Sequence, residues 1–199
     1  MALKKAVFLD KDGTFVVDVP CNVDPKKIVL VSNAFAALRL LSELGYKLLV
    51  ITNQSGIARG YFSEQELILY LDKLDILFRE SNIILDGFYY CPHDKSADCD
   101  CRKPKPGMIQ KAAHEHGIDL AASWFIGNTL NDVEAGYRAG CRTILIDDGN
   151  ETLGEFNRDS SSLQQSAERI PHYIVRNLYS ASHIINSKSN SMWLGVGVG

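Results

Sequence analysis

The sequence has no apolar run approaching the roughly 20 residues that a membrane-spanning helix needs. It also lacks a secretory signal, because the apolar stretch after Lys5 lasts four residues and then meets Asp10. Excess positive charge is missing too, since 21 Lys and Arg residues against 24 Asp and Glu residues give a net charge of -3. These absences argue against binding to nucleic acid or to an anionic membrane. The missing signal indicates a cytoplasmic protein. We also expect a monomer, although no sequence pattern sets the oligomeric state.

Cysteine is scarce, with five residues in 199, and three of the five lie close to one histidine. Without a secretory signal, cysteines are more often free thiols or metal ligands than disulfides. The clustered residues are Cys91, His93, Cys99 and Cys101. Three thiols and one imidazole form a ligand set for tetrahedral zinc, and four protein ligands make such a site structural. The sequence therefore predicts a zinc loop over residues 91–101, with free thiols as the alternative.

Two aspartates follow a short apolar run near the start of the chain. Residues 6–9 are continuously apolar, as expected of a parallel strand covered on both faces, and Asp10 and Asp12 come directly after them. Open α/β sheets bind their ligands at the carboxyl ends of the strands. Two carboxylates so close repel each other unless a cation lies between them or one holds a proton. The pair therefore indicates a chemical role.

Strand-like runs alternate with helical patterns along the rest of the chain. We expect further strands at 46–51, 88–90, 124–126, 143–146 and 173–175. We expect helices at 33–44, 63–78, 106–116, 131–139 and 178–185. This alternation predicts an α/β fold with a central parallel sheet in three layers. One domain would span residues 1–185, and the Ser- and Asn-rich residues 186–199 would form a flexible tail.

The segment 8–14, Phe-Leu-Asp-Lys-Asp-Gly-Thr, resembles the nucleophile motif of the haloacid dehalogenase (HAD) superfamily of phosphatases. The resemblance implies a three-layer Rossmann-like fold. No insertion here is long enough for a large lid, so we expect a small cap or none. The resemblance also implies that Asp10 attacks the phosphoryl group and forms an aspartyl-phosphate. Asp12 would protonate the leaving alcohol and then activate water.

Two further stretches resemble phosphate-binding motifs of the superfamily. Residues 52–62 are similar to the second motif of a subfamily of histidinol-phosphate and heptose-bisphosphate phosphatases, which also shares the Cys-Pro-His and Cys-Asp-Cys-Arg-Lys-Pro loop. The hydroxyl of Thr52 and the amide of Asn53 can donate hydrogen bonds to phosphoryl oxygens without adding charge. By resemblance, Lys103 steadies the nucleophile and the transferring group, and Arg102 grips the substrate's phosphate.

The fourth motif departs from the family pattern. The superfamily has Gly-Asp followed by a second acid four residues later, whereas Asn128 takes the first position here and Asp132 keeps the second. The resemblance implies Mg²⁺ bound by Asp10, Asp12 and these two side chains. A neutral amide offers Mg²⁺ one oxygen but removes a full charge. Three explanations fit: an active natural variant, a variant that has lost activity, and an engineered inactivation.

Together the motifs predict a Mg²⁺-dependent phosphomonoester hydrolase that acts on a small sugar phosphate, foremost a heptose bisphosphate. Histidinol phosphate is the alternative substrate. A catalytically impaired binding protein is the alternative that Asn128 raises. For Arg59 two interpretations stay open, contact with a second anionic group of the substrate or simple solvation in a loop.

Overall fold

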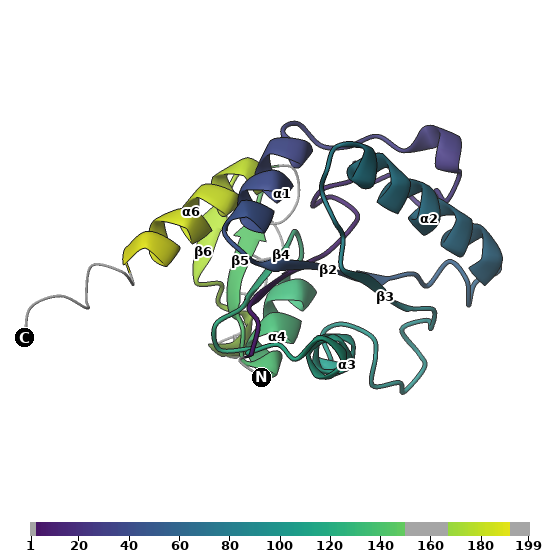
Figure 1. The fold of residues 1–199 in the computed structure, drawn as a ribbon. Helices are drawn as coiled ribbons and strands as arrows, with labels where there is room; N and C mark the ends of the chain where they lie inside the picture. Colours follow the sequence, from purple (N-terminus) through teal and green to yellow (C-terminus); the bar gives the residue numbers. More distant parts are fainter. Residues whose placement is uncertain (1–2, 150–166, 192–199) are drawn as a thin grey trace, which may run out of the picture.

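Six parallel strands form one sheet in the computed structural model of the chain, which describes residues 3–149 and 167–191 (Figure 1). The strands are β1 (Ala6–Leu9), β2 (Lys47–Asn53), β3 (Gly87–Cys91), β4 (Trp124–Gly127), β5 (Arg142–Ile146) and β6 (Tyr173–Val175). Their order is β3-β2-β1-β4-β5-β6, so the direction of winding reverses at β1 and β4. Such a reversal opens a crevice at the carboxyl ends of the strands, where α/β proteins bind ligands.

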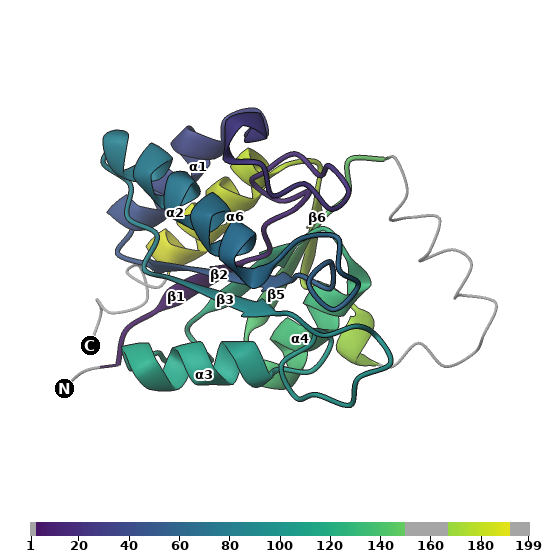
Figure 2. The same cartoon turned by 90° about the vertical axis from the view of Figure 1, so that its right-hand side faces the viewer.

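Helices cover both faces of the sheet, which confirms the expected three-layer α/β fold (Figure 2). The helices are α1 (Ala34–Glu43), α2 (Glu64–Glu80), α3 (Gly107–His116), α4 (Leu130–Ala139) and α6 (Leu178–Ser191). Helices α1, α2 and α6 pack on one face, and α3 and α4 pack on the other. None of the helices in the described part of the chain has the length and hydropathy that crossing a bilayer requires.

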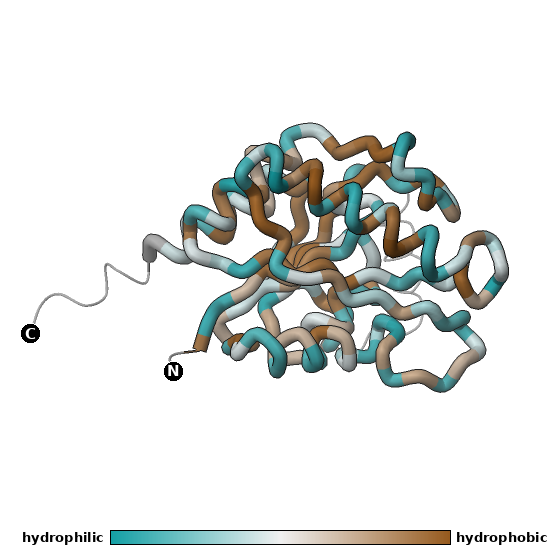
Figure 3. The backbone as a smooth tube through the Cα atoms, turned by 45° about the vertical axis from the view of Figure 1, so that its right-hand side comes forward, coloured by the Kyte–Doolittle hydropathy of each residue, from teal (hydrophilic) through white to brown (hydrophobic). Residues whose placement is uncertain are grey.

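The apolar core lies on both sides of β1. Val7 and Leu9 pack toward α1 and α6, whereas Ala6 and Phe8 pack toward α3 and α4, and all four are fully buried. In Figure 3 the tube is hydrophobic at the centre of the sheet, whereas hydrophobic and hydrophilic stretches alternate along the surrounding helices. The residues that directly follow β1 therefore lie at the carboxyl edge of the sheet, where the crevice opens.

An irregular connection of residues 10–33 leads from β1 to α1. An antiparallel bridge joins Val16 to Leu30, and one 3₁₀ turn spans Pro25–Lys27. No larger insertion interrupts the strand–helix alternation among residues 3–149 and 167–191. This agrees with the expectation of a small cap or none.

Helix α6 continues past Ile185, where the sequence analysis placed the end of the domain. Residues 186–191 are helical, so the helix is six residues longer than the sequence analysis expected. The hydroxyl of Ser189 donates to the carbonyl of Ile185 and contacts the hydroxyl of Tyr46 at 3.1 Å. Ser and Asn are unfavourable inside helices because their side chains can bond to nearby backbone groups, so the composition of this stretch gave no helical signal. Residues 192–199 of the expected tail lie outside the described residues.

Candidate active site

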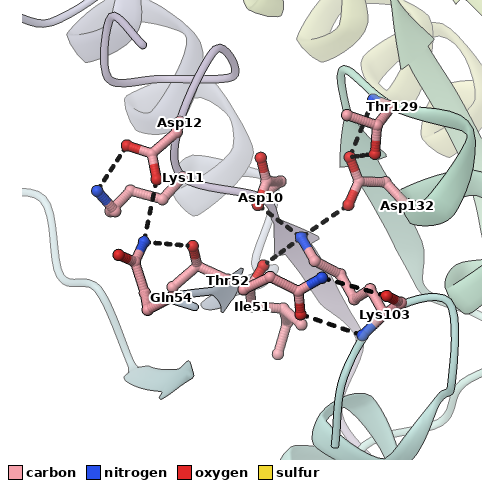
Figure 4. A network of polar contacts seen from close by, with 10 residues as sticks. Asp10, Lys11, Asp12, Ile51, Thr52, Gln54, Lys103, Thr129 and Asp132 are labelled. Atoms are coloured by element: carbon pink, nitrogen blue, oxygen red, sulfur yellow. Dashed lines mark hydrogen bonds and ion pairs between the residues drawn. The ribbon is translucent and has the colours of Figure 1, made fainter. Parts of the chain in front are cut away.

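The ammonium group of Lys103 lies at the centre of a polar cluster at the carboxyl ends of β1 and β2 (Figure 4). It contacts Asp10 Oδ1 at 2.5 Å and Asp132 Oδ1 at 2.7 Å, and it donates to the carbonyl oxygen of Ile51 at 2.9 Å. The side chains of Lys103 and Asp132 are 4% and 1% exposed, respectively. The fold therefore gathers two carboxylates around one buried cation, and Asp10 and Lys103 lie close enough to share one phosphoryl group.

The cluster carries more negative charge than Lys103 neutralises. Burial raises the pKa of Asp10, the charge of Lys103 lowers it, and the carboxylates of Asp132 and Asp12 raise it again, so that it lies at about 7. Burial lowers the pKa of Lys103, but the attraction of Asp10 and Asp132 outweighs burial and holds that pKa above its ordinary value. A further cation would relieve the remaining repulsion among the carboxylates.

Asp12 lies beside this cluster, and both of its carboxylate oxygens are held. The Lys11 ammonium contacts Oδ1 at 2.6 Å, and the Gln54 side-chain amide donates to Oδ2 at 3.0 Å. The same amide donates to Thr52 Oγ1 at 2.9 Å. Sequence reasoning missed Lys11 and Gln54, although each directly adjoins a residue that it selected. The sequence could have indicated these two residues only by their positions, Lys11 between the two aspartates and Gln54 just after the second strand.

The side chain of Asn53 contacts the backbone of Lys103. Its Oδ1 accepts from the backbone N–H of Lys103 at 3.1 Å, and its Nδ2 donates to the backbone carbonyl of Lys103 at 3.2 Å. This reciprocal pair ties the end of β2 to the loop that carries Lys103. The amide therefore braces the loop, and this bracing uses one of the two N–H donors of its NH₂ group.

Asn128 and Asp132 lie at the start of α4, opposite the first motif. Gly13 has a φ of +75° and sits so close to Asn128 that a β-carbon at residue 13 would lie 2.1 Å from Asn128 Nδ2. Asp132 Oδ2 accepts from the backbone N–H and the hydroxyl of Thr129, at 3.0 and 2.7 Å, which leaves Oδ1 to face Lys103. Carboxylate and amide oxygens are ligands that Mg²⁺ accepts. The donor set and its surplus of negative charge fit Mg²⁺, with one carboxylate fewer than the family pattern has.

Arg59 and Arg102 both contact the cysteine loop. Arg59 donates to Asp94 Oδ1 from Nε at 3.2 Å and from Nη2 at 2.8 Å. Arg102 donates to the carbonyl oxygen of His93 at 3.0 Å. Arg102 also lines a cleft of about 660 Å³ that reaches Lys103. Arg102 therefore shares a cleft with Lys103, whereas Arg59 is paired with a carboxylate of its own chain.

The four residues predicted to bind zinc converge. Their ligand atoms all lie within 4.8 Å of one another. Cys91 Sγ lies 3.7 Å from Cys99 Sγ and 3.6 Å from His93 Nδ1, and His93 Nδ1 lies 3.3 Å from Cys101 Sγ. With Zn–S bonds near 2.3 Å, two sulfurs of a zinc tetrahedron lie about 3.8 Å apart. The separations and donor types fit a zinc ion. Of the other cysteines, Cys21 is an exposed free thiol and Cys141 a buried one.

Backbone hydrogen bonds join the cysteine loop to the loop after β2. The backbone N–H of Gln54 donates to the carbonyl of Cys91 at 2.8 Å, and that of Ala58 donates to the carbonyl of Pro92 at 3.2 Å. The Arg59–Asp94 pair adds a third connection. A metal that stiffens residues 91–101 would therefore also stiffen the loop after β2, which carries Gln54.

Comparison with known proteins places these features in a family. The family model of haloacid dehalogenase-like hydrolases matches residues 21–140, and a second model of HAD-like hydrolases matches residues 100–181. Over 179 residues, covering 86% of this chain and 97% of the relative, the chain is 36% identical to D-glycero-beta-D-manno-heptose-1,7-bisphosphate 7-phosphatase of Pasteurella multocida. The protein of the same name from Vibrio cholerae is 38% identical over 181 residues, covering 87% of this chain and 97% of that protein.

Solved structures agree with the sequence matches. The crystal structure of D,D-heptose 1,7-bisphosphate phosphatase from B. bronchiseptica, complexed with magnesium and phosphate, has a TM-score of 0.79 and 27% identity. The match covers 92% of this chain and 99% of that one. A putative HAD-like phosphatase from Mesorhizobium loti has a TM-score of 0.77 and 29% identity, covering 95% of this chain and 87% of that one.

Replacing Lys103 by Met tests the charge balance of the cluster. Asp10 and Asp132 would stay buried without their shared cation, and breaking a buried ion pair in this way costs about 3–5 kcal/mol. We expect the free energy of unfolding, measured in urea at about pH 8 without added Mg²⁺, to fall by about that amount. A protonated carboxyl needs no cation, so the deficit relative to wild type should shrink as the pH falls toward about 6.

The control for this measurement is Lys105→Met, which removes a more exposed lysine of the same loop that pairs with Asp98. This variant should unfold as the wild type does at both pH values. Equal losses in the two variants, or a deficit that grows on acidification, would contradict the charge balance described for Asp10 and Asp132.

Proposed function

Because this chain belongs to the haloacid dehalogenase-like hydrolase family, we propose that it is a phosphatase that removes the 7-phosphate of D-glycero-D-manno-heptose 1,7-bisphosphate. The observation that carries the proposal is the contact of buried Lys103 with Asp10 at the carboxyl end of β1. The names of the relatives from P. multocida and V. cholerae support the substrate, and the phosphate complex of the B. bronchiseptica enzyme supports the reaction.

In the proposed reaction, Asp10 attacks phosphorus as the bond to the sugar oxygen breaks, and an aspartyl-phosphate forms. Asp12 gives its proton to the leaving oxygen and then takes a proton from the water that hydrolyses the intermediate. The ammonium of Lys103 and the hydroxyl of Thr52 stabilise negative charge on the equatorial phosphoryl oxygens. Asn53 contributes by holding the backbone of Lys103 in place.

Asp10, the carbonyl of Asp12, Asn128 and Asp132 would hold Mg²⁺. When bound, Mg²⁺ neutralises charge so that an anionic carboxylate can approach an anionic phosphate. The surplus of buried negative charge at Asp10 supports this assignment. Arg102, which shares a cleft with Lys103, would grip the substrate's phosphate. For Arg59, its pairing with Asp94 favours a role within the loops.

We propose in addition that Cys91, His93, Cys99 and Cys101 bind a structural zinc. The separations of their ligand atoms support this assignment. Four protein ligands also complete a tetrahedral zinc site, which needs no further donor. The metal would fix a loop that has little apolar core and is joined to the Lys103 segment. Such thiol ligands persist in a reducing compartment. The cytoplasmic location and the monomeric state remain predictions from the sequence.

Phosphate release tests the proposed activity. With Mg²⁺ present, the chain should release phosphate from heptose 1,7-bisphosphate at a higher kcat/KM than from histidinol phosphate. Asp10→Asn should lower kcat on the order of a thousandfold or more, because the nucleophile is lost. Asp98→Asn, which changes an almost fully exposed carboxylate of the cysteine loop, is the matched control and should leave kcat unchanged. Preference for histidinol phosphate would reassign the substrate, and no release from either compound would contradict the activity.

A magnesium titration tests the role of Asn128, which also motivates the alternative of a catalytically impaired binding protein. Asn128→Asp restores the carboxylate of the family pattern and should tighten Mg²⁺ binding by about tenfold or more, as followed by calorimetry. Equal Mg²⁺ affinities of the wild type and Asn128→Asp would show that residue 128 does not bind the metal. If only Asn128→Asp hydrolyses the substrate, the wild type is a catalytically impaired binding protein. If the wild type turns over and Asn128→Asp is no faster, that alternative is excluded.

Metal analysis tests the zinc assignment. The purified chain should contain one zinc ion, and Cys99→Ser should lose it. Its melting temperature should fall by roughly 5–10 °C, since each kcal/mol of lost stability shifts a domain of this size by roughly 2–4 °C. Cys21→Ser, an exposed cysteine outside the loop, should keep both zinc and stability. Retention of zinc by Cys99→Ser, or its absence from the wild type, would contradict the assignment.

A further inference from the structure

We propose that Lys11 and Gln54 are positioning residues, which hold the carboxylate of Asp12 in one orientation for proton transfer to the leaving oxygen. The inference rests on the proposed function, because it assigns the two residues a purpose within that reaction. The two side chains approach Asp12 from different elements, Lys11 from the turn after β1 and Gln54 from the end of β2, and each contacts a different oxygen.

Lys11 is buried to an unusual degree for a lysine, with 1% of its side chain exposed. Its ammonium lies 2.6 Å from Asp12 Oδ1 and 4.7 Å from the centre of the Tyr70 ring. Burial raises the pKa of Tyr70 to about 12, so the ring is neutral and offers its π face to the cation. An ammonium group loses much hydration free energy when it is buried, and only a fixed counter-charge compensates for that loss. Lys11 and Asp12 therefore hold each other in place.

Gln54 holds the other oxygen of Asp12 through an amide whose orientation is fixed by chemistry. Only the NH₂ end of an amide can face a carboxylate, because the carbonyl end would place two acceptors together. One N–H of this NH₂ group goes to Asp12 Oδ2 and the second goes to Thr52 Oγ1. The Gln54 backbone is anchored to the carbonyl of Cys91, and the residue is only 6% exposed. The amide is thus a rigid bridge between Asp12 and Thr52.

The same bridge orients Thr52. Its hydroxyl oxygen accepts from Gln54, so its own hydrogen is turned toward another acceptor. In the proposed reaction that acceptor is a phosphoryl oxygen. Gln54 would therefore align both the residue that binds the phosphoryl group and the residue that protonates the leaving group.

The catalytic consequence follows from how a carboxyl group rotates. The terminal torsion of an aspartate is broad, so an unrestrained Asp12 would often turn its proton away from the leaving oxygen. In the transfer step the Asp10–phosphorus bond forms, the phosphorus–oxygen bond breaks, and the proton that Asp12 carries in its acid form moves to the departing oxygen. This leaves Asp12 as the carboxylate that pairs with Lys11. A sugar alkoxide needs that proton, whereas p-nitrophenolate is stable enough to depart without it. Loss of either positioning residue should therefore slow the hydrolysis of sugar phosphates far more than the hydrolysis of p-nitrophenyl phosphate.

The experiment compares kcat/KM for the heptose bisphosphate and for p-nitrophenyl phosphate, because kcat/KM reports the steps up to formation of the aspartyl-phosphate. In Lys11→Met and Gln54→Met, the ratio of sugar to aryl kcat/KM should fall about tenfold or more, mainly through kcat. Lys11→Arg, which keeps the charge and a donor, should stay within about threefold of wild type. Lys73→Met and Gln65→Met, on the exposed face of α2, are matched controls and should leave the ratio unchanged.

A second measurement separates positioning from general damage. Because Gln54 also aligns Thr52, only part of its effect passes through Asp12. Gln54→Met should therefore lower kcat/KM for the sugar phosphate at least about threefold less in an Asp12→Asn protein than in the wild type. Full additivity in this pair, or equal loss on both substrates in the single variants, would overturn the inference while leaving the proposed function intact. Gln54→Met exchanges one neutral side chain for another, so this variant can test the positioning role even if Lys11→Met fails to fold. A wild-type protein that hydrolyses neither substrate would overturn the proposed function, and the inference with it.

Discussion

One buried ammonium group holds the site together. Lys103 contacts carboxylates that come from β1 and α4, and it also caps the carbonyl at residue 51 in β2. Ion pairs buried this deeply contribute little net stability, because desolvation offsets attraction, but loss of one partner is costly. The arrangement therefore specifies position more than it stabilises the fold. It fixes where β1, β2, α4 and the cysteine loop meet, which is where the proposed chemistry takes place.

The loop that delivers Lys103 has little apolar packing of its own, and its rigidity comes from other sources. Backbone hydrogen bonds join it to the segment after β2, and the reciprocal bonds of Asn53 clamp the backbone of Lys103. The Cys₃His cluster supplies a further means of stiffening within the same loop. The lysine of the proposed active site therefore lies on a loop that is fixed at several points.

The sequence predicted the sheet and the location of the site because both depend on local patterns. Continuous apolar runs identify buried parallel strands, and polar residues directly after them must lie at one edge of the sheet. The partners of individual side chains were less predictable. Asn53 bonds to the Lys103 backbone, Gln54 bridges Asp12 and Thr52, and Arg59 pairs with Asp94. Each of these choices depends on which loops the fold brings together. No local pattern records that information, and the same holds for the helical continuation beyond Ile185.

The account's central claim is that Asp10, held beside Lys103, receives the phosphoryl group. The most direct test is to quench turnover of a ³²P-labelled sugar phosphate with acid and to map the label on the protein. The account predicts label on the peptide that contains Asp10, and more of it in Asp12→Asn, where hydrolysis of the intermediate is slowed. Phosphate release without label on that peptide, in the wild type and in Asp12→Asn, would contradict it.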